Sequence, residues 1–251
     1  MIAFNAIYIM WIREVKRFVR SKSRILAALA QPVLFLISLG YGLGPIYEKA
    51  EQGNFLEFIA PGVIGMTIIF PAIFNGAQVI WDRRFGFLKE AMVAPVSRLS
   101  IMLGRTLGGA TIAVLQGILL MLVAIIGGFR PLSIIATVVA IFVMFLIAIV
   151  FSAIGISISS KMKDMHGFQL IGNFLIMPLF FLSGALFPLK HAPKVMLWIA
   201  YVDPMSYSVD ALRYALIGIS AFDPALDITI LAIMGGGFLW LGSHFFSTVE
   251  M

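Results

Sequence analysis

The sequence of 251 residues contains no cysteine, and Asp, Glu, Lys and Arg make up only 12% of it. Without cysteine there is neither a disulfide framework nor a thiolate metal site. The three histidines, His166, His191 and His244, lie far apart in the sequence and suggest no metal cluster. A Gly-x-x-x-x-Gly-Lys-Ser/Thr run, which cradles nucleotide phosphates, is also absent. We therefore expect no metal, no cofactor of its own and no ATP hydrolysis by this chain alone.

What the sequence has in excess is apolar residues, at 61%, with a mean hydropathy of +1.03. A soluble domain is close to half apolar and one quarter charged, so this composition favours a protein that resides in a bilayer. The net charge of +6 comes from basic residues that crowd beside apolar stretches. Anionic lipid and membrane topology explain this pattern better than nucleic acid does, and we expect no nucleic-acid partner.

Six apolar stretches approach or exceed the roughly 20 residues that cross a hydrocarbon core. They predict an all-α polytopic membrane protein in which 25–251 forms one domain of six transmembrane helices. The predicted spans are 25–44, 58–80, 106–127, 133–160, 168–187 and 228–249. Small residues at three- and four-residue spacing predict close helix packing at three places, Gly40 with Gly44, Gly104 with Gly108, and the stripe Ala148, Ser152, Gly155 and Ser159.

Two other segments flank or interrupt these spans. Residues 1–24 predict a cytoplasmic amphipathic helix in the membrane interface, because aromatic residues from Phe4 to Phe18 recur at helical spacing opposite a basic face. Residues 189–227 hold two short apolar stretches separated by Asp203–Pro204. We interpret them as a re-entrant helix pair between spans five and six, on the extracytoplasmic side; a seventh crossing is the alternative.

Most of the 18 Lys and Arg residues lie on the same side of the membrane as the N-terminus. The positive-inside rule therefore places both termini in the cytoplasm, in a multi-pass protein of the cell's inner membrane. The segment 81–105, WDRRFGFLKEAMVAPVSRLSIMLGR, then faces the cytoplasm. Its mixture of basic and apolar residues fits a docking site for a soluble partner, and it fits equally a solvated loop that only sets the topology.

Segment 81–105 resembles the loop between spans two and three of ABC type-2 exporter permeases. The shared pattern is an arginine-rich start, a glycine, a leucine and an Ala-Pro-Val-Ser/Thr-Arg stretch, found here between Arg83 and Arg98. The resemblance implies a coupling helix that docks into an ATPase subunit. The candidate coupling residues are Arg83, Arg84, Gly86, Phe87, Leu88, Glu90, Pro95 and Arg98.

A second likeness to this family covers the fifth span and the segment after it. Leu182-Ser183-Gly184 leads to Phe187-Pro188, and Asp203-Pro204 stands where the family more often has Asn-Pro. The resemblance implies that the short helices form a gate above the pathway. The candidate gate residues are Phe187, Trp198, Tyr201, Asp203, Pro204, Tyr207, Asp210 and Arg213. Asp210 and Arg213 are three residues apart, so we expect them to form an ion pair on one face of a helix.

By resemblance, the chain is the non-catalytic permease subunit of an exporter for a drug, lipid or lipid-linked glycan. The family implies a second permease protomer, as a homodimer, and two ATP-binding cassette subunits that bind ATP and Mg²⁺. Neutral polar and aromatic residues of the spans are candidates for the pathway. They are Phe70, Phe74, Asn75, Gln78, Asn173, Phe180 and Phe181. The mid-span amides Gln31, Asn75, Gln78, Gln116 and Asn173 are expected mainly to hydrogen-bond between helices, with a minority lining the pathway.

Two other functions are weighed against the exporter. A gradient-driven secondary transporter would need acidic groups at mid-membrane, and the spans lack them. An intramembrane serine protease would need Ser183 and His244 within about 3 Å. The predicted topology places these two residues near opposite ends of their spans, which disfavours a catalytic dyad.

Overall fold

The computed structural model describes residues 3–49, 54–85, 97–162, 164–189 and 192–247. Within these ranges the chain is helical, without a β-strand, and six helical segments are long and apolar enough to cross a membrane. The predicted all-α polytopic fold with six candidate spans is therefore confirmed. The helices are α1 (Phe4–Val19), α2 (Lys22–Lys49), α3 (Phe55–Phe74), α4 (Ala77–Arg84), α6 (Arg98–Ile126), α7 (Ile134–Lys161), α8 (Met165–Leu182), α9 (Lys194–Val202), α10 (Pro204–Ile217) and α11 (Pro224–Ser247).

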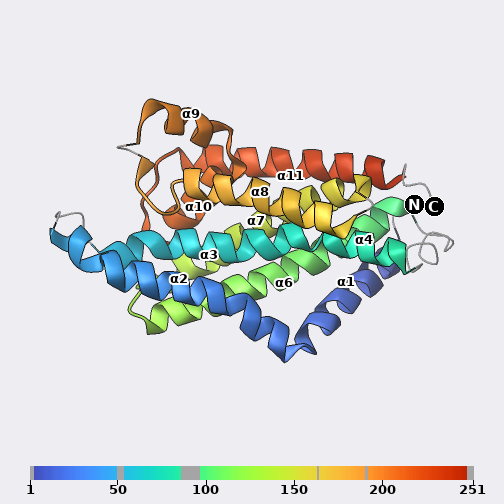
Figure 1. The fold of residues 1–251 in the computed structure, drawn as a ribbon, viewed down its shortest axis with the longest axis horizontal. Coiled ribbons are helices and arrows are strands. Elements are labelled where there is room, and N and C mark those ends of the chain that lie inside the picture. Colours follow the sequence, from blue (N-terminus) through green and yellow to red (C-terminus); the bar gives the residue numbers. More distant parts are fainter. Residues whose placement is uncertain (1–2, 50–53, 86–96, 163, 190–191, 248–251) are drawn as a thin grey trace.

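The long helices lie side by side along the longest axis of the molecule (Figure 1). The start of α1, the end of α4 and the end of α11 lie toward one end of this bundle, and α9 and α10 lie toward the other. Helix α3 is the central element, since it packs against α2, α6 and α7 and is buried at every residue from Ile59 to Ile69. A helix that is apolar all round, as this one is, belongs in such a core.

Polar caps set the beginnings of several helices. The side chains of Asn54, Ser97, Ser133, Asp164 and Asp203 each accept a hydrogen bond from a backbone N–H in the first turn of α3, α6, α7, α8 and α10, respectively. These bonds satisfy donors that have no partner inside the helix. The last of them, at Asp203–Pro204, separates α9 from α10 at the break predicted from the sequence.

The second span differs from its prediction, because it is broken between α3 and α4 at Asn75 and Gly76. Gly76 lies directly against the backbone of Gly155 on α7, and a side chain on Gly155 would collide with the carbonyl group of Ile73. The small-residue stripe predicted on the fourth span thus provides a backbone contact with the break. The absence of a Cβ at these two glycines is what allows the approach.

The predicted cytoplasmic segment 81–105 is also partly helical. Its residues 81–84 complete α4 and its residues 98–105 begin α6, so both ends of the segment extend the neighbouring spans. The charged residues Asp82 and Arg105, which predict a loop in the sequence, lie instead in helices α4 and α6. Their charges are compensated by the ion pair between these two helices.

Helix α1 packs along α6, where Gly104 and Gly108 allow the two helices to meet closely. A Cβ on Gly104 would lie 2.7 Å from the Ile7 carbonyl oxygen, and one on Gly108 would lie 2.7 Å from the Glu14 Cβ. The face of α1 that is buried carries Met10, Glu14 and Phe18, whereas much of the aromatic face, including Phe4 and Tyr8, stays exposed. The exposed aromatic residues remain available to contact lipid, so the location of α1 in the membrane interface stays a prediction.

Candidate functional site

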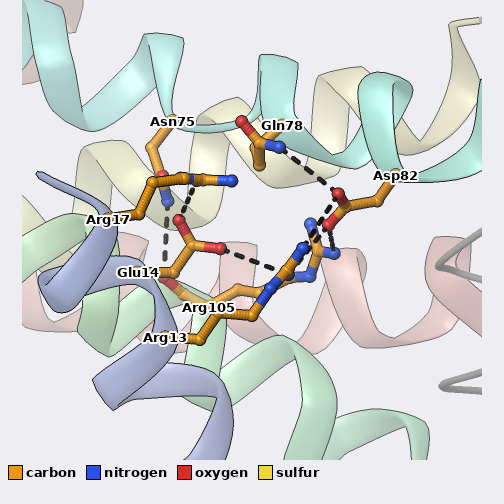
Figure 2. A network of polar contacts seen from close by, with 7 residues as sticks. All are labelled: Arg13, Glu14, Arg17, Asn75, Gln78, Asp82 and Arg105. Carbon is orange, nitrogen blue, oxygen red and sulfur yellow. Dashed lines mark hydrogen bonds and ion pairs between the residues drawn. The ribbon is translucent and has the colours of Figure 1, made fainter. Parts of the chain in front are cut away.

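Charged residues from three helices meet near the end of the bundle where α4 ends (Figure 2). We name Arg13, Glu14, Arg17, Asp82 and Arg105 the charge cluster. They belong to α1, α4 and α6, so the cluster joins the N-terminal helix to both helices that flank residues 86–96. The sequence places these residues up to about 90 positions apart, and only the packing of α1 on α6 brings them together.

Asp82 is the centre of one half of the cluster. Its carboxylate accepts hydrogen bonds from the Nη2 of Arg105, from Arg13 at 3.3 and 3.4 Å and from the Gln78 amide at 3.3 Å. Asp82 and Arg105 are 5% and 1% exposed. A buried carboxylate needs this number of charged and polar partners, because desolvation of an unpaired ion costs several kcal/mol.

Glu14 is the centre of the other half and is itself 1% exposed. It pairs with Arg17 one turn later on α1, and its Oε1 lies 3.7 Å from the Nη1 of Arg13. Three arginines face two carboxylates, so the cluster keeps a positive charge. Sequence reasoning missed Glu14, although a lone acid within a basic and aromatic helix could have drawn attention to it.

Of the predicted coupling residues, Arg83 and Arg84 end α4, and Arg98 begins α6. Arg83 donates hydrogen bonds to the carbonyl oxygens of Met162 and Ser160 at 3.2 and 2.9 Å, at the end of α7. A cation suits the carbonyl end of a helix. Arg84 is exposed. The other members of the set, Gly86, Phe87, Leu88, Glu90 and Pro95, lie outside the described residues.

A cavity of about 470 Å³ opens beside the charge cluster, bounded by α1, α2, α3, α4, α6 and α8. Its volume falls in the range of small-molecule sites. Four predicted pathway residues line it, namely Phe70, Phe74, Asn75 and Gln78. Gln31 and Gln116, for which the sequence left both interhelical hydrogen bonding and the pathway open, also line the cavity, together with Glu14, Arg17, Thr67, Trp81 and Gln169.

The remaining three pathway candidates lie elsewhere on α8. Asn173 and Phe181 are exposed, and Phe180 is buried beside Phe35 and Phe181 with ring centroids 6.3 and 5.6 Å apart. Phe180 therefore belongs to the packing between α2 and α8. The structure does not bring these residues to the cavity with the other four.

The predicted gate residues surround α9 and α10. Helix α10 is buried along most of its length, whereas Trp198 and Tyr201 on α9 are 73% and 55% exposed. The Tyr207 hydroxyl donates to the Tyr201 carbonyl oxygen at 2.6 Å, which joins the two helices. Phe187 is half-buried just before them.

Asp203 joins α9 to α10 as the cap of α10. Its carboxylate accepts from the backbone N–H of Met205 at 2.8 Å and from the Ser206 hydroxyl at 3.2 Å. Burial raises the pKa of Asp203 to about 7, against the opposite effect of these two hydrogen bonds.

The expected pair of Asp210 and Arg213 is present but long, at 3.9 Å. The Asp210 carboxylate mainly accepts from the backbone N–H groups of Ala221 and Phe222, at 2.8 to 2.9 Å. Burial raises the pKa of Asp210 more than these bonds lower it. Each residue of the pair therefore anchors a different loop.

Arg213 reaches across to the turn after α8. It donates to the Gly184 carbonyl oxygen at 2.8 Å and its guanidinium lies 4.3 Å from the centre of the Phe58 ring. Gly184 has φ +75°, a conformation that favours glycine. The arginine thus connects α10, the turn at Gly184 and the start of α3.

Residues 5–217 match the ABC-2 type transporter family. The chain belongs to this family. It is 26% identical over 212 residues to the inner membrane transport permease YadH of Escherichia coli strain K12, covering 84% of this chain and 82% of YadH. It is 28% identical over 211 residues to nodulation protein J of Rhizobium leguminosarum, covering 83% of this chain and 81% of that protein. It is thus a membrane permease subunit of an ABC transporter.

The geometry of this ABC-2 permease gives no support to a protease dyad. The Ser183 hydroxyl is buried and donates to the Phe180 carbonyl oxygen at 2.9 Å. His244 is exposed near the end of α11, where it stacks on Trp240 with ring centroids 6.2 Å apart. Among the described residues, no group of three or more His, Asp or Glu side chains could hold a metal ion.

Proposed function

We propose that two copies of this permease and two ATP-binding cassette subunits form an exporter for a hydrophobic or amphipathic substrate. The partner subunits bind ATP and Mg²⁺, and the permease, which is not an enzyme, provides the path out of the cytoplasm or the inner leaflet. Family membership supports the class of transporter.

The observation that carries this proposal is the ion pair between Asp82 and Arg105. These residues lie on α4 and α6, near the two ends of the proposed docking segment 81–105. Movement of the docking segment would therefore act on α4 and α6 together. Arg13 extends the connection to α1. This arrangement suits a coupling element, because a force on the segment reaches three packed helices at once.

The distribution of basic residues supports a cytoplasmic position for this end of the bundle. Helix α1, the end of α4 and the start of α6 carry most of the arginines of the described chain. The protein has no cysteine, so an introduced thiol can be labelled without background. We expect Arg84→Cys to react with a membrane-impermeant maleimide only from the cytoplasmic side. Labelling from the opposite side would contradict the orientation and, with it, the docking of an ATPase.

Coupling is tested by placing charge in the docking segment. The double variant Gly86→Glu/Leu88→Glu should insert into the membrane and fold, yet lose the ATPase activity that the co-purified ATP-binding subunits show with the unaltered permease. Leu132→Glu is the matched control, since Leu132 is exposed toward the other end of the bundle. Full ATPase activity in the double variant, or transport driven by an ion gradient without nucleotide, would contradict the proposal.

A further inference from the structure

Gln116 is one of three buried polar residues that line the cavity, with Glu14 and Thr67. It is 4% exposed, yet its amide makes no hydrogen bond within the part of the chain that the structure describes. It lies 11 residues beyond Arg105 on α6, about 16 Å further along the helix axis, and a similar distance before the end of that helix. Its carboxamide lines the cavity, so its donor and acceptor are available to a ligand there.

Four other carboxamide side chains line the cavity. The Asn75 amide nitrogen donates a hydrogen bond to the Arg105 backbone carbonyl oxygen, and the Gln78 amide nitrogen donates one to the Asp82 carboxylate. Each distance is 3.3 Å, and Figure 2 shows both contacts. Their side-chain carbonyl oxygens carry no hydrogen bond within the described residues. Gln31 and Gln169, which are exposed, are the other two carboxamide residues of the lining.

The lining of the cavity carries one acidic and one basic side chain. Glu14 and Arg17 both line the cavity, and they pair with one another. The remaining polar groups of the lining are neutral, and aromatic side chains, including Phe70 and Trp81, form much of the rest. The positive excess of the charge cluster lies on Arg13 and Arg105, which share Asp82 and do not line the cavity. A charged ligand would therefore lose its hydration without meeting an unpaired counter-ion in the lining. Amide groups beside aromatic faces suit a ligand that presents hydroxyl or amide groups together with apolar surface.

We propose that this cavity binds an uncharged amphipathic ligand carrying hydroxyl or amide groups, and that the Gln116 carboxamide is its central hydrogen-bonding group. The inference rests on the proposed export function and names the substrate class that the pathway accepts. A neutral glycolipid and a neutral hydroxylated drug both present this chemistry. Gln116 is a specificity-determining residue of the site, while the aromatic residues provide contact with the apolar part.

Binding can be measured on the full-length permease in nanodiscs, because Trp81 lines the same cavity. The probe is an alkyl glucoside with a brominated chain, whose bromine quenches nearby tryptophan; the part of the quenching that disappears in Trp81→Phe reports the cavity. We expect saturable quenching by the glucoside. Gln116→Met, which keeps the volume and removes the amide, should raise the Kd about five- to tenfold.

Two controls separate ligand binding from a structural role. Ser152→Ala removes a buried hydroxyl without a hydrogen-bond partner in the described residues, on α7 and away from the cavity lining, and should leave the Kd unchanged. Without ligand, Gln116→Met should unfold at the same temperature as the unaltered protein or higher, since the amide that is lost makes no hydrogen bond within the described residues. A lower unfolding temperature, or dissociation of the permease dimer, would show that the amide has a protein partner and would overturn the proposal.

The choice of probe separates the chemical classes. A brominated alkyl sulfate of the same chain length should bind less tightly than the glucoside; tighter binding would overturn the assignment to neutral ligands. A neutral macrolactone that competes with the glucoside would identify a drug-like source, and competition only by glycolipids would identify a lipid source. An unchanged Kd for Gln116→Met would overturn the role of this residue.

This experiment is independent of ATP hydrolysis. If glucoside binding depends on Gln116 but no ATP-binding subunit associates, the proposed function fails and the ligand site stands. If coupled ATPase activity is found and Gln116→Met changes neither binding nor the stimulation of ATPase activity by the glucoside, the exporter stands and the ligand site fails.

Discussion

Asp82 and Arg105 form a buried ion pair although they are 23 positions apart, near the two ends of the proposed docking segment 81–105. The pair joins α4 to α6. Arg13 and Gln78 supply the remaining hydrogen bonds to the Asp82 carboxylate. The sequence alone assigns both residues to a polar loop. Their burial changes what a substitution at either position is expected to do.

Removing one member of this pair should be strongly destabilising. Asp82→Ala leaves Arg105 buried without its carboxylate, and we expect a loss of about 3 to 5 kcal/mol in the free energy of unfolding. Arg13→Ala is the matched control and should cost less than about 1 kcal/mol, because the Arg13 side chain is 32% exposed. Denaturant unfolding of the purified permease measures both. Equal losses in the two variants would contradict the dominance of the buried pair.

A second prediction concerns the backbone contact between α7 and the break in the second span. Gly155→Ala places a Cβ against the Ile73 carbonyl group, so the helices must move apart, at a cost of about 1 to 3 kcal/mol. Gly236→Ala on α11 is the control, because nothing lies within 4 Å of the Cβ that it adds. Thermal unfolding should show a lower midpoint only for the first variant; an unchanged midpoint for Gly155→Ala would refute the close contact.

The contacts of Arg213 predict that lysine cannot replace it. A lysine has no planar group to cover the Phe58 ring while it donates to the Gly184 carbonyl oxygen. We expect Arg213→Lys to destabilise the protein by roughly 2 kcal/mol, close to the effect of Arg213→Met. The same variants should raise proteolysis of the turn around Gly184. Recovery of full stability by lysine would mean that charge alone matters at this position.

The raised pKa of Asp203 predicts a pH dependence of stability with a defined sign. Between about pH 4 and pH 7 the folded protein keeps a proton that the unfolded chain has released, so the free energy of unfolding falls as pH rises through this window. The slope is at most about 1.4 kcal/mol per pH unit. Above pH 7 this contribution is constant.

Asp203→Asn tests this prediction, because the amide oxygen can still accept the hydrogen bond from the Met205 N–H that begins α10. The variant should show a flatter dependence of the unfolding midpoint on pH between 4 and 7, and equal or greater stability at pH 8. A steep dependence that persists in Asp203→Asn would assign the titration to another group.

Sequence patterns identified most of the fold because the bilayer imposes strict local rules. A stretch of about 20 apolar residues has few alternatives to a membrane-spanning helix, and each of the six predicted spans overlaps a helix in the structure. The helix break at Asp203–Pro204 followed from the geometry of proline in the same way. The sequence placed residues 81–84 and 98–105 in a charged cytoplasmic loop, whereas the structure shows that they extend helices α4 and α6.

The sequence by itself determined that this chain crosses a membrane with six helices and has the pattern of an ABC-2 permease, since apolar length and local motifs are carried by neighbouring residues. Only the tertiary structure decided that Glu14 is buried, that Asp82 pairs with Arg105, and that Gln116 faces a cavity. The physical reason is that compensation of a buried charge or amide depends on residues from other helices. Periodicity within one helix cannot show which of its faces meets them.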